Sequence, residues 1–318
     1  NLNLKTSLRK ISLSPLFTIT LDGLELGNLA SIKKISFSPN LIALLFGKVV
    51  IHGLNIVEPV INLELLEDVK LNLPVLAQQG NPPAVYLTSL RGENGKIIFT
   101  DRKISAVGFQ VIVNKLNVKV SKVTLPVISL AADFKISAEL VNSGGKAFGN
   151  ITFGGWLDYL AKDMDAKLEL KDLDVANFAP YYGNLISNKK INSAMLNSNS
   201  TFKSNNNDLE ILTDLNLSRI VYEKTPESEP AQEQPVFDLV NSTLDLFTDA
   251  SGRLALQFKI NTLMDKPALS REKIMNIILK AAMKNLSHQS PQQIADKVSQ
   301  VIEKYKDIGK ELKNIFGK

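Results

Sequence analysis

Few side chains of this 318-residue chain are suited to catalysis or metal binding. The chain contains no Cys and two His, His52 and His288, which lie far apart in the sequence. Without Cys there are no disulfides, thiolate zinc sites or Cys nucleophiles, and two distant histidines disfavour a His-rich metal centre or a Ser-His-Asp site. Carboxylate chemistry is the possibility that remains open.

Several aspartates are candidates for such chemistry. Two carboxylates held close together could serve as general acid and general base, which is the first requirement of a hydrolase site. Aspartates beside glycine or at strand ends more often accept backbone hydrogen bonds in turns and caps. We therefore expect turn and capping roles, with no catalytic residue, no metal and no cofactor. The aspartates concerned are Asp22, Asp101, Asp172, Asp174 and Asp249.

The elements that would position any site are strands. Apolar and polar residues alternate with a period of two through most of residues 1–264. This alternation predicts a mainly β fold: an antiparallel, amphipathic sheet with one dry and one wet face. The residues that we assign to the dry face, which would bind lipid if that face forms a groove, are Leu254, Leu256, Phe258, Ile260, Phe134, Ile136, Leu168 and Leu170.

Turns and one short helix interrupt the strands. Glycine and asparagine tolerate the positive φ of hairpin turns, which predicts turns at several glycine-containing sites. Residues 39–46 read as a short helix with Ser38 as N-cap, Pro39 at its first position and Gly47 as its stop. The predicted turns are at residues 22–23, 92–95, 142–145, 154–155 and 251–252.

Two polar segments weaken the strand pattern. Residues 188–208 are rich in Asn and Ser, which disfavours a strand there. Residues 223–235 hold three Pro and four Glu with scarcely any apolar residue, so we expect a loosely ordered insertion. The expected domains are therefore a β-rich body over residues 1–264, containing that insertion, and a separate tail over residues 265–318.

The net charge of +5 belongs to the tail. Residues 265–318 contain 11 basic and 6 acidic residues, so the body has no net charge and no nucleic-acid partner is expected. Helical spacing of apolar residues after Ser270 predicts a basic amphipathic tail. The tail could cap the body, dimerise, or lie on an anionic membrane, where Lys273, Lys280 and Lys284 are the candidate docking residues.

The dry face of the sheet has to be covered, and the alternation leaves three kinds of cover open. A second sheet would give a sandwich or barrel, helices could pack on the face, or a lipid could lie in a curved groove. Apolar runs such as residues 41–46 and 49–51 are too short for a membrane-spanning helix.

The order of segments along the chain resembles the AsmA-like family. The similarity begins in the N-terminal region, continues through a glycine-rich segment that looks like the family's hairpin, and extends to the end of the body. The segments that carry it are residues 19–28, 31–39, 41–47, 49–64, 92–101, 171–182, 246–256 and 265–267.

The resemblance implies an envelope protein of a bacterium with two membranes. Members of the family project into the periplasm from an N-terminal inner-membrane anchor, and larger ones look like bridge-like lipid carriers with a taco-shaped β-groove. We therefore expect a strongly curved sheet forming an open groove, phospholipid or another acyl-chain lipid as ligand, and envelope proteins as partners. A sheet this short is not expected to cross an envelope alone.

The expected function is lipid transport or outer-membrane maintenance in the periplasm, without enzymatic activity. Because the chain begins at Asn1 in an apparent strand, we interpret it as part of a longer protein whose anchor lies upstream. A ligand-free β-sandwich with a structural or assembly role is the alternative, and a hydrolase with paired carboxylates is the third candidate.

The charge distribution generates a first prediction. Deleting residues 270–318 should abolish the charge-driven binding to anionic liposomes and leave the β body folded, because the excess positive charge lies in the tail. Liposome co-sedimentation and far-UV circular dichroism measure the two outcomes. Unchanged liposome binding by the shortened chain would show that the tail is not the docking element.

Overall fold

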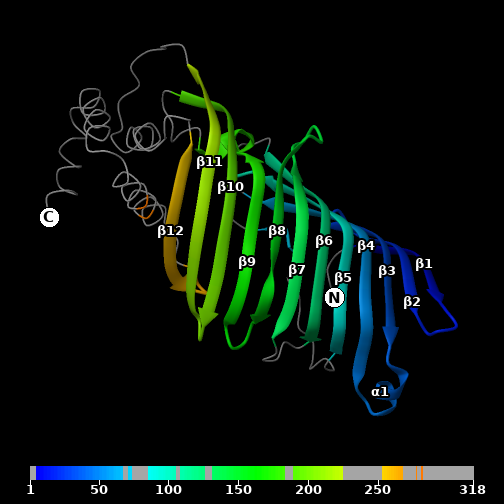
Figure 1. The fold of residues 1–318 in the computed structure, drawn as a ribbon. Helices are drawn as coiled ribbons and strands as arrows, with labels where there is room; N and C mark the ends of the chain where they lie inside the picture. The colour runs from blue at the N-terminus through cyan, green and yellow to red at the C-terminus, as the bar shows by residue number, and fades with distance from the viewer. Residues whose placement is uncertain are drawn as a thin grey trace. The chain divides into compact units, whose positions relative to one another are not determined.

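The computed structural model describes residues 5–66, 71–73, 85–104, 108–125, 131–182, 189–224 and 253–267, together with Ile277 and Ala281. Strands make up 74% of the structure described, and they form one 12-stranded mixed sheet that is not closed into a barrel (Figure 1). The prediction of a mainly β fold is therefore confirmed.

The sheet follows the order of the chain from β1 to β12. Its strands are β1 (Thr6–Leu13), β2 (Ile19–Leu26), β3 (Ala30–Pro39), β4 (Val49–Leu65), β5 (Val85–Asp101), β6 (Phe109–Leu125), β7 (Ala132–Val141), β8 (Ala147–Asp158), β9 (Asp163–Asp174), β10 (Lys189–Asn205), β11 (Asp208–Lys224) and β12 (Leu254–Leu263). The helical elements are α1 (Leu41–Leu45), the 3-10 turn η1 (Val175–Phe178) and α2 (Ala179–Tyr182).

The chain divides into two compact units. The first contains residues 1–171, 201–210 and 263–266, and the second contains residues 172–200, 211–262 and 267–318. The expected insertion lies outside the described residues except for Glu223 and Lys224, which end β11. The docking lysines Lys273, Lys280 and Lys284 also lie outside them, as do the expected tail helices apart from Ile277 and Ala281.

The sheet is not purely antiparallel, so that part of the prediction is wrong. From β1 to β9 each strand is antiparallel to the next, with the exception of β4 and β5, which run parallel. A parallel pair requires a connection that returns to the starting end of the first strand. Residues 66–84 are long enough to make that return.

The short helix is present, but the predicted cap is wrong. α1 spans Leu41–Leu45, and its N-cap is Asn40, whose Oδ1 accepts the Ala43 N–H at 3.0 Å. Ser38 and Pro39 belong instead to the end of β3. Gly47 follows the helix with φ +68°, a conformation that glycine adopts without steric cost, so its role as helix stop is confirmed.

Most of the predicted glycine turns are wrong. Residues 142–145 do form a turn between β7 and β8, where Gly145 N–H donates to the Asn142 carbonyl at 2.9 Å. Residues 22–23, 92–95 and 154–155 lie inside β2, β5 and β8. At Gly155, β8 and β9 approach so closely that a Cβ would overlap the Ala166 backbone. Residues 251–252 lie outside the described part.

The Asn- and Ser-rich segment forms a continuous strand, contrary to expectation. β10 spans Lys189–Asn205, and several of its small polar side chains have partners. Ser200 Oγ pairs with Thr213 Oγ1 at 2.9 Å, and Ser204 Oγ donates to the Lys162 carbonyl at 2.6 Å. Hydroxyl groups that are satisfied in this way can be buried in a sheet at little cost.

The long strands contain residues with a left-handed backbone. Eight residues inside the described strands have φ between 48° and 66°. Each lies where the apolar alternation shifts by one residue, as in β6, whose apolar positions change phase at Lys115 and at Lys122. These eight residues, termed here the phase-shift residues, are Gly23, Gly53, Glu58, Asn94, Lys115, Lys122, Asp172 and Arg219.

Each phase shift keeps the apolar residues on one face. An extra residue in a strand reverses the direction of all later side chains, which would turn the apolar set outward. The sequence compensates at each shift with two consecutive residues that do not belong to the apolar face, such as Glu93 and Asn94 or Asn114 and Lys115. The apolar alternation then resumes one position later. Backbone and sequence therefore change phase at the same place.

Polar groups on adjacent strands secure the phase-shift residues. Glu58 pairs with Lys33 at 2.6 Å, and Lys115 pairs with Glu139 at 2.8 Å. Asn94 N–H donates to Asn117 Oδ1 at 3.2 Å, and Asn117 Nδ2 donates to the Lys115 carbonyl at 2.8 Å. In the second unit, Asp172 N–H donates to Asn197 Oδ1 at 3.0 Å. Asparagine side chains thus bind backbone groups at three of the phase-shift residues, Asn94, Lys115 and Asp172.

Substitution of Lys115 tests the importance of the left-handed backbone. Lys115→Val should lower the free energy of unfolding by about 1–3 kcal/mol, because a β-branched side chain is strained at the φ of 48° found there. Lys115→Gly should stay within about 1 kcal/mol of wild type, since relief of the backbone offsets loss of an exposed ion pair.

Urea denaturation measures these differences. Lys119→Val is the matched control, because Lys119 is an exposed lysine of the same strand and is not among the residues with positive φ. Equal destabilisation by the valine at both positions would contradict the prediction.

Candidate functional site

The first unit carries an uninterrupted row of apolar residues across nine strands. Each residue of the row is the direct cross-strand partner of the next, from β1 to β9. Side chains at such positions share one face of a sheet. The row, termed here the apolar row, consists of Ile11, Leu21, Ile35, Ile56, Gly92, Val118, Ile136, Phe153 and Leu168.

None of the nine residues of the apolar row is buried. Ile11 is 65% exposed, and the other eight are half-buried. The middle of a sheet that packs against a second sheet would be expected to be fully buried. In the described part of this unit every strand belongs to the same sheet and the helix is the five-residue α1, so a second layer does not account for the row.

Aromatic rings extend the apolar face beside the row. Phe153 packs edge-on against Phe134, with ring centroids 4.9 Å apart, and against Phe202, at 5.7 Å. Such contacts add to the stability that burial alone provides. The three rings come from β7, β8 and β10, so the apolar face includes the part of β10 that belongs to the first unit.

Four of the predicted binding residues lie together on this face. Ile136 and Leu168 belong to the apolar row, and Phe134 is the diagonal neighbour of Phe153. Leu170 pairs with Ile151 one step further along β8 and β9. All four are half-buried, as the face of an open sheet would be.

The other four predicted binding residues belong to β12 in the second unit. Leu254, Leu256 and Ile260 are only 4%, 6% and 9% exposed, and Phe258 is half-buried. The alternation along β12 is as predicted, with Ala255, Gln257 and Lys259 exposed. The degree of burial is that of core residues in this unit.

Sequence reasoning missed the part of the face formed by β1 to β6. Residues such as Ile35, Ile56 and Val118 were not assigned to it, because the phase shifts break their alternation into runs of two or three apolar positions. The signal that would have revealed them is the pair of consecutive polar residues between two apolar runs.

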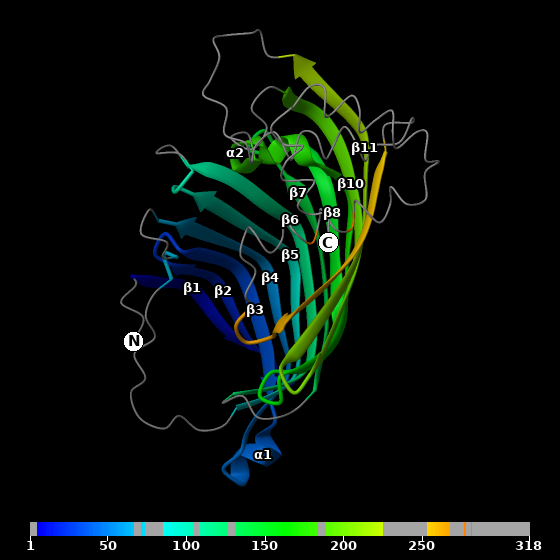
Figure 2. The ribbon, with the colours of Figure 1, turned by 90° about the vertical axis from the view of Figure 1, so that its left-hand side faces the viewer.

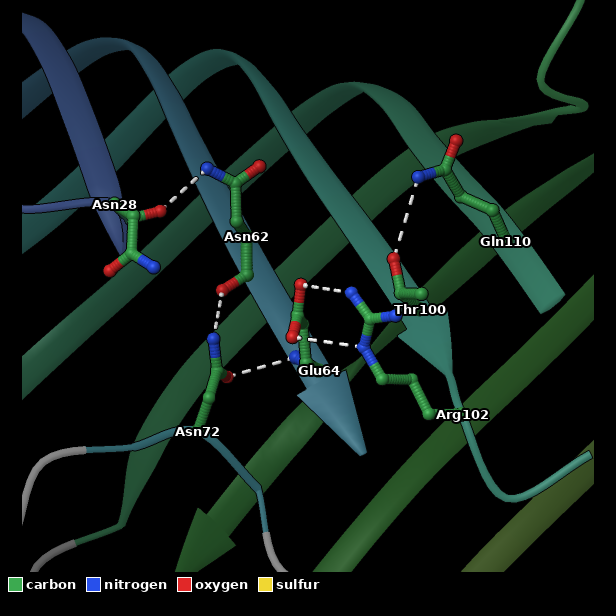
Figure 3. Close-up of polar contacts among 7 residues, drawn as sticks. All are labelled: Asn28, Asn62, Glu64, Asn72, Thr100, Arg102 and Gln110. Carbon is green, nitrogen blue, oxygen red and sulfur yellow. Dashed lines mark hydrogen bonds and ion pairs between the residues drawn. The ribbon is translucent and has the colours of Figure 1, made fainter. Parts of the chain in front are cut away.

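A polar cluster occupies the end of the first unit where β4 finishes (Figure 3). Arg102 donates from Nε and Nη2 to the two carboxylate oxygens of Glu64, both at 3.3 Å, and this pairing raises the pKa of Arg102. Asn72 donates to the Asn62 carbonyl at 3.1 Å and accepts the Glu64 N–H at 2.9 Å. These bonds attach residues 71–73 to β4.

The polar cluster contains no group with the features of a catalytic acid or base. Its carboxylate, Glu64, is bound by an arginine that keeps its charge at every accessible pH. Asn62 donates to the Asn28 carbonyl at 2.8 Å, and Gln110 donates to Thr100 Oγ1 at 3.4 Å. These bonds connect β4 to the β2–β3 turn, to residues 71–73 and to the residue after β5, and they connect β5 to β6.

The candidate aspartates lie in separate places. Asp101 Oδ1 accepts the Lys103 N–H at 2.9 Å in the turn after β5, and Asp174 Oδ1 accepts the Ala176 N–H at 3.1 Å as the cap of η1. These are the predicted turn and capping roles. Asp22 and Asp172 lie inside β2 and β9, and Asp249 lies outside the described residues.

His52 is an exposed residue of β4, and its Nε2 lies 3.1 Å from Nδ2 of Asn40. Within the described part of the chain, no three His, Cys, Asp or Glu side chains are grouped as metal ligands. No helix in that part is long and apolar enough to span a membrane.

A scan against models of protein families finds no match, and a search of curated proteins also finds none.

An ion pair closes the other end of the first unit. Asp265 Oδ2 accepts from Lys162 Nζ at 2.6 Å, and its Oδ1 accepts from Asn207 Nδ2 at 3.0 Å. These contacts join the β8–β9 turn, the β10–β11 turn and the residues after β12. The hydrogen bonds from Lys162 and Asn207 lower the pKa of Asp265 below its ordinary value of 3.8.

The lowered pKa predicts how this closure depends on pH. The stabilisation that ionised Asp265 provides is fully present above pH 3.8. It is lost as the pH falls through the lower pKa that Asp265 has in the folded state. Lys162→Met removes the hydrogen bond that lowers the pKa of Asp265 most. The variant should therefore show a higher pKa of Asp265 in an NMR titration of the Asp265 carboxyl carbon. Lys167→Met, at an exposed lysine of β9, should leave it unchanged. Equal shifts in the two variants would contradict the assignment.

Proposed function

We propose that this chain is a non-enzymatic lipid-binding protein of the bacterial cell envelope, in which acyl chains lie on the apolar face of the sheet. The observation that carries the proposal is the apolar row, whose nine residues are aligned across nine strands and are not buried. Covering such a face with an acyl chain is favourable, because full burial of one aliphatic side chain stabilises by about 1.5–3 kcal/mol.

The positions of the phase-shift residues support a curved groove. Cross-strand register places Gly23 opposite Lys33, Lys33 opposite Glu58, and Glu58 beside Asn94, so a line of interruptions crosses β2 to β5. The register between β5 and β6 also shifts next to this line, between Gly92 and Ile97. Bulges bend strands and increase their twist, and aligned bulges bend neighbouring strands at the same level. We infer that the sheet folds around its apolar face there.

The resemblance to the AsmA-like family supplies the setting of the proposal. It suggests a periplasmic protein that is anchored to the inner membrane in its full-length form and that takes part in lipid transport or outer-membrane maintenance. The phospholipid or other acyl-chain lipid would be the ligand, and envelope proteins would be partners. The phase-shifted amphipathic strands are compatible with that role, since they preserve an apolar face over strands of up to 17 residues.

A ligand-free structural or assembly protein is the second candidate. The low exposure of Leu254 and Leu256 favours it, because side chains at 4% and 6% exposure pack as an ordinary core. The two candidates differ in the first unit, where an apolar face without ligand would have to be covered by a protein partner.

Substitution on the two faces of β7 tests the proposal. Ile136→Asn places an amide in the apolar row, whereas Ser137→Asn is the matched change on the adjacent residue, which points to the other face. Native mass spectrometry of protein purified from bacteria should detect bound lipid on wild type and on Ser137→Asn. Ile136→Asn should retain at least about tenfold less, an effect equivalent to roughly 1.4 kcal/mol of binding free energy.

Circular dichroism provides the folding control. Because Ile136 is half-buried, its substitution should leave the β signal intact. Absence of lipid from the wild-type chain, with unfolding of Ile136→Asn, would overturn the lipid proposal and support the ligand-free alternative.

A further inference from the structure

The connection between β3 and β4 exposes an apolar helix. All five residues of α1 are apolar, and Ile42 and Leu45 are 70% and 85% exposed. Phe46, directly after the helix, is 77% exposed. Exposed apolar side chains gathered in this way mark an interaction site, because a solitary surface leucine is ordinary and a contiguous group is not.

The adjacent connection between β1 and β2 has the same character. Leu16 is 85% exposed and Phe17 is 51% exposed. The two connections lie at the same end of the sheet, because Ile19 pairs with Phe37 and Thr18 Oγ1 lies 2.9 Å from Ser38 Oγ. Residues 14–17 and 41–46 together are termed here the apolar tip.

The apolar tip projects beyond the strands and is held in place by the backbone. α1 lies past the ends of β3 and β4 in both ribbon views (Figures 1 and 2). Asn40 N–H donates to the Val50 carbonyl at 2.8 Å, and Lys48 N–H donates to the Ala43 carbonyl at 2.9 Å, so both ends of the connection are tied to the sheet or the helix. The exposed side chains are therefore presented by a defined structure.

The two segments that carry the apolar tip contain a single charged side chain. No Asp or Glu occurs in residues 11–21 or 35–57, and the one charged side chain in these two segments is Lys48, directly after Gly47. The opposite end of β4 and β5, by contrast, carries Glu64, Arg102 and the asparagines of the polar cluster. The two ends of these strands therefore differ in polarity.

Aromatic side chains are also exposed at the end of the first unit that carries the apolar tip. Tyr86 lies beside Val50 at the start of β5, and Trp156 and Tyr159 lie at the end of β8. All three are exposed. Tyrosine and tryptophan favour the boundary between the hydrocarbon and the head groups of a bilayer, since their rings are apolar at one side and polar at the other.

We propose that the apolar tip inserts into the surface of a lipid bilayer, with Lys48 at the level of the head groups. A projecting group of apolar side chains requires a matched cavity in a protein partner, whereas the boundary region of a bilayer accepts it without one. A lysine beside it can keep its ammonium group among lipid phosphates. The inference goes beyond the proposed function, because it does not depend on acyl chains binding to the sheet face.

Single cysteines test the insertion directly, because the natural chain contains none. Leu45→Cys places an environment-sensitive fluorophore on the apolar tip. Leu73→Cys is the matched control, because Leu73 is also exposed, at 52%, but follows the polar cluster at the opposite end of β4. The vesicles consist of phosphatidylcholine, which has no net charge, so that the basic tail is not attracted to them. With them, the label at residue 45 should shift to shorter wavelength, and the label at residue 73 should not.

Serine substitution measures the contribution of the tip to binding. The double variant Leu45→Ser, Phe46→Ser should reduce partitioning into the same vesicles by roughly 10- to 100-fold in a flotation assay, and Leu73→Ser should not change it. Binding should also persist at high salt, since it is driven by apolar contact.

Two results would overturn the proposal. One is an unshifted label at residue 45 on protein that floats with the vesicles, which would assign binding to another part of the chain. The other is a conversion of dimers to monomers by the serine variants without any change in flotation, which would assign the tip to contact between two copies. Loss of insertion with retained lipid adducts in native mass spectrometry would leave the proposed function standing.

Discussion

The apolar face of the first unit requires the backbone and the apolar pattern of the sequence to change phase at the same residues of a strand. A strand that changes phase once, without a matching change in its apolar pattern, would turn half of its apolar side chains into water. β4, β5 and β6 each have 17 residues and contain phase-shift residues, so the agreement has to be restored inside every one of them. The apolar row is continuous because backbone and sequence are brought back into phase in each of these strands.

The left-handed positions also determine which residue types the sheet tolerates in its interior. Glycine, asparagine and aspartate adopt positive φ readily, but Glu58, Lys115 and Arg219 do so at a cost. At the first two, ion pairs with Lys33 and Glu139 on the adjacent strand accompany that cost. Such exposed pairs contribute little to stability individually. Their position is more informative, because each pair links a phase-shift residue to the adjacent strand.

The sequence was sufficient to predict a mainly β fold, the alternation in strands such as β12, and the short helix before β4. Those features depend on residues that are close in sequence, such as the alternation from Leu254 to Ile260. It was misleading at Gly23 and Gly155, because glycine serves turns and also strand interiors. Gly23 has a positive φ inside β2, and at Gly155 the backbone of β9 approaches closely. The apolar row could not be predicted, since the alignment of Ile56 with Gly92 and Val118 depends on a parallel pair and on the number of phase shifts before each residue.

The parallel pairing of β4 with β5 has a consequence for the order in which the sheet can assemble. The antiparallel pairs from β1 to β4, and from β5 to β9, join strands that follow one another closely in the chain, so each group can form from local contacts. β4 and β5 are separated by residues 66–84 and can pair only after the chain has returned to the start of β4, and this closure costs conformational entropy. Topology of this kind slows folding. We therefore expect β4 and β5 to pair after the two antiparallel groups have formed, within a sheet that is continuous once complete.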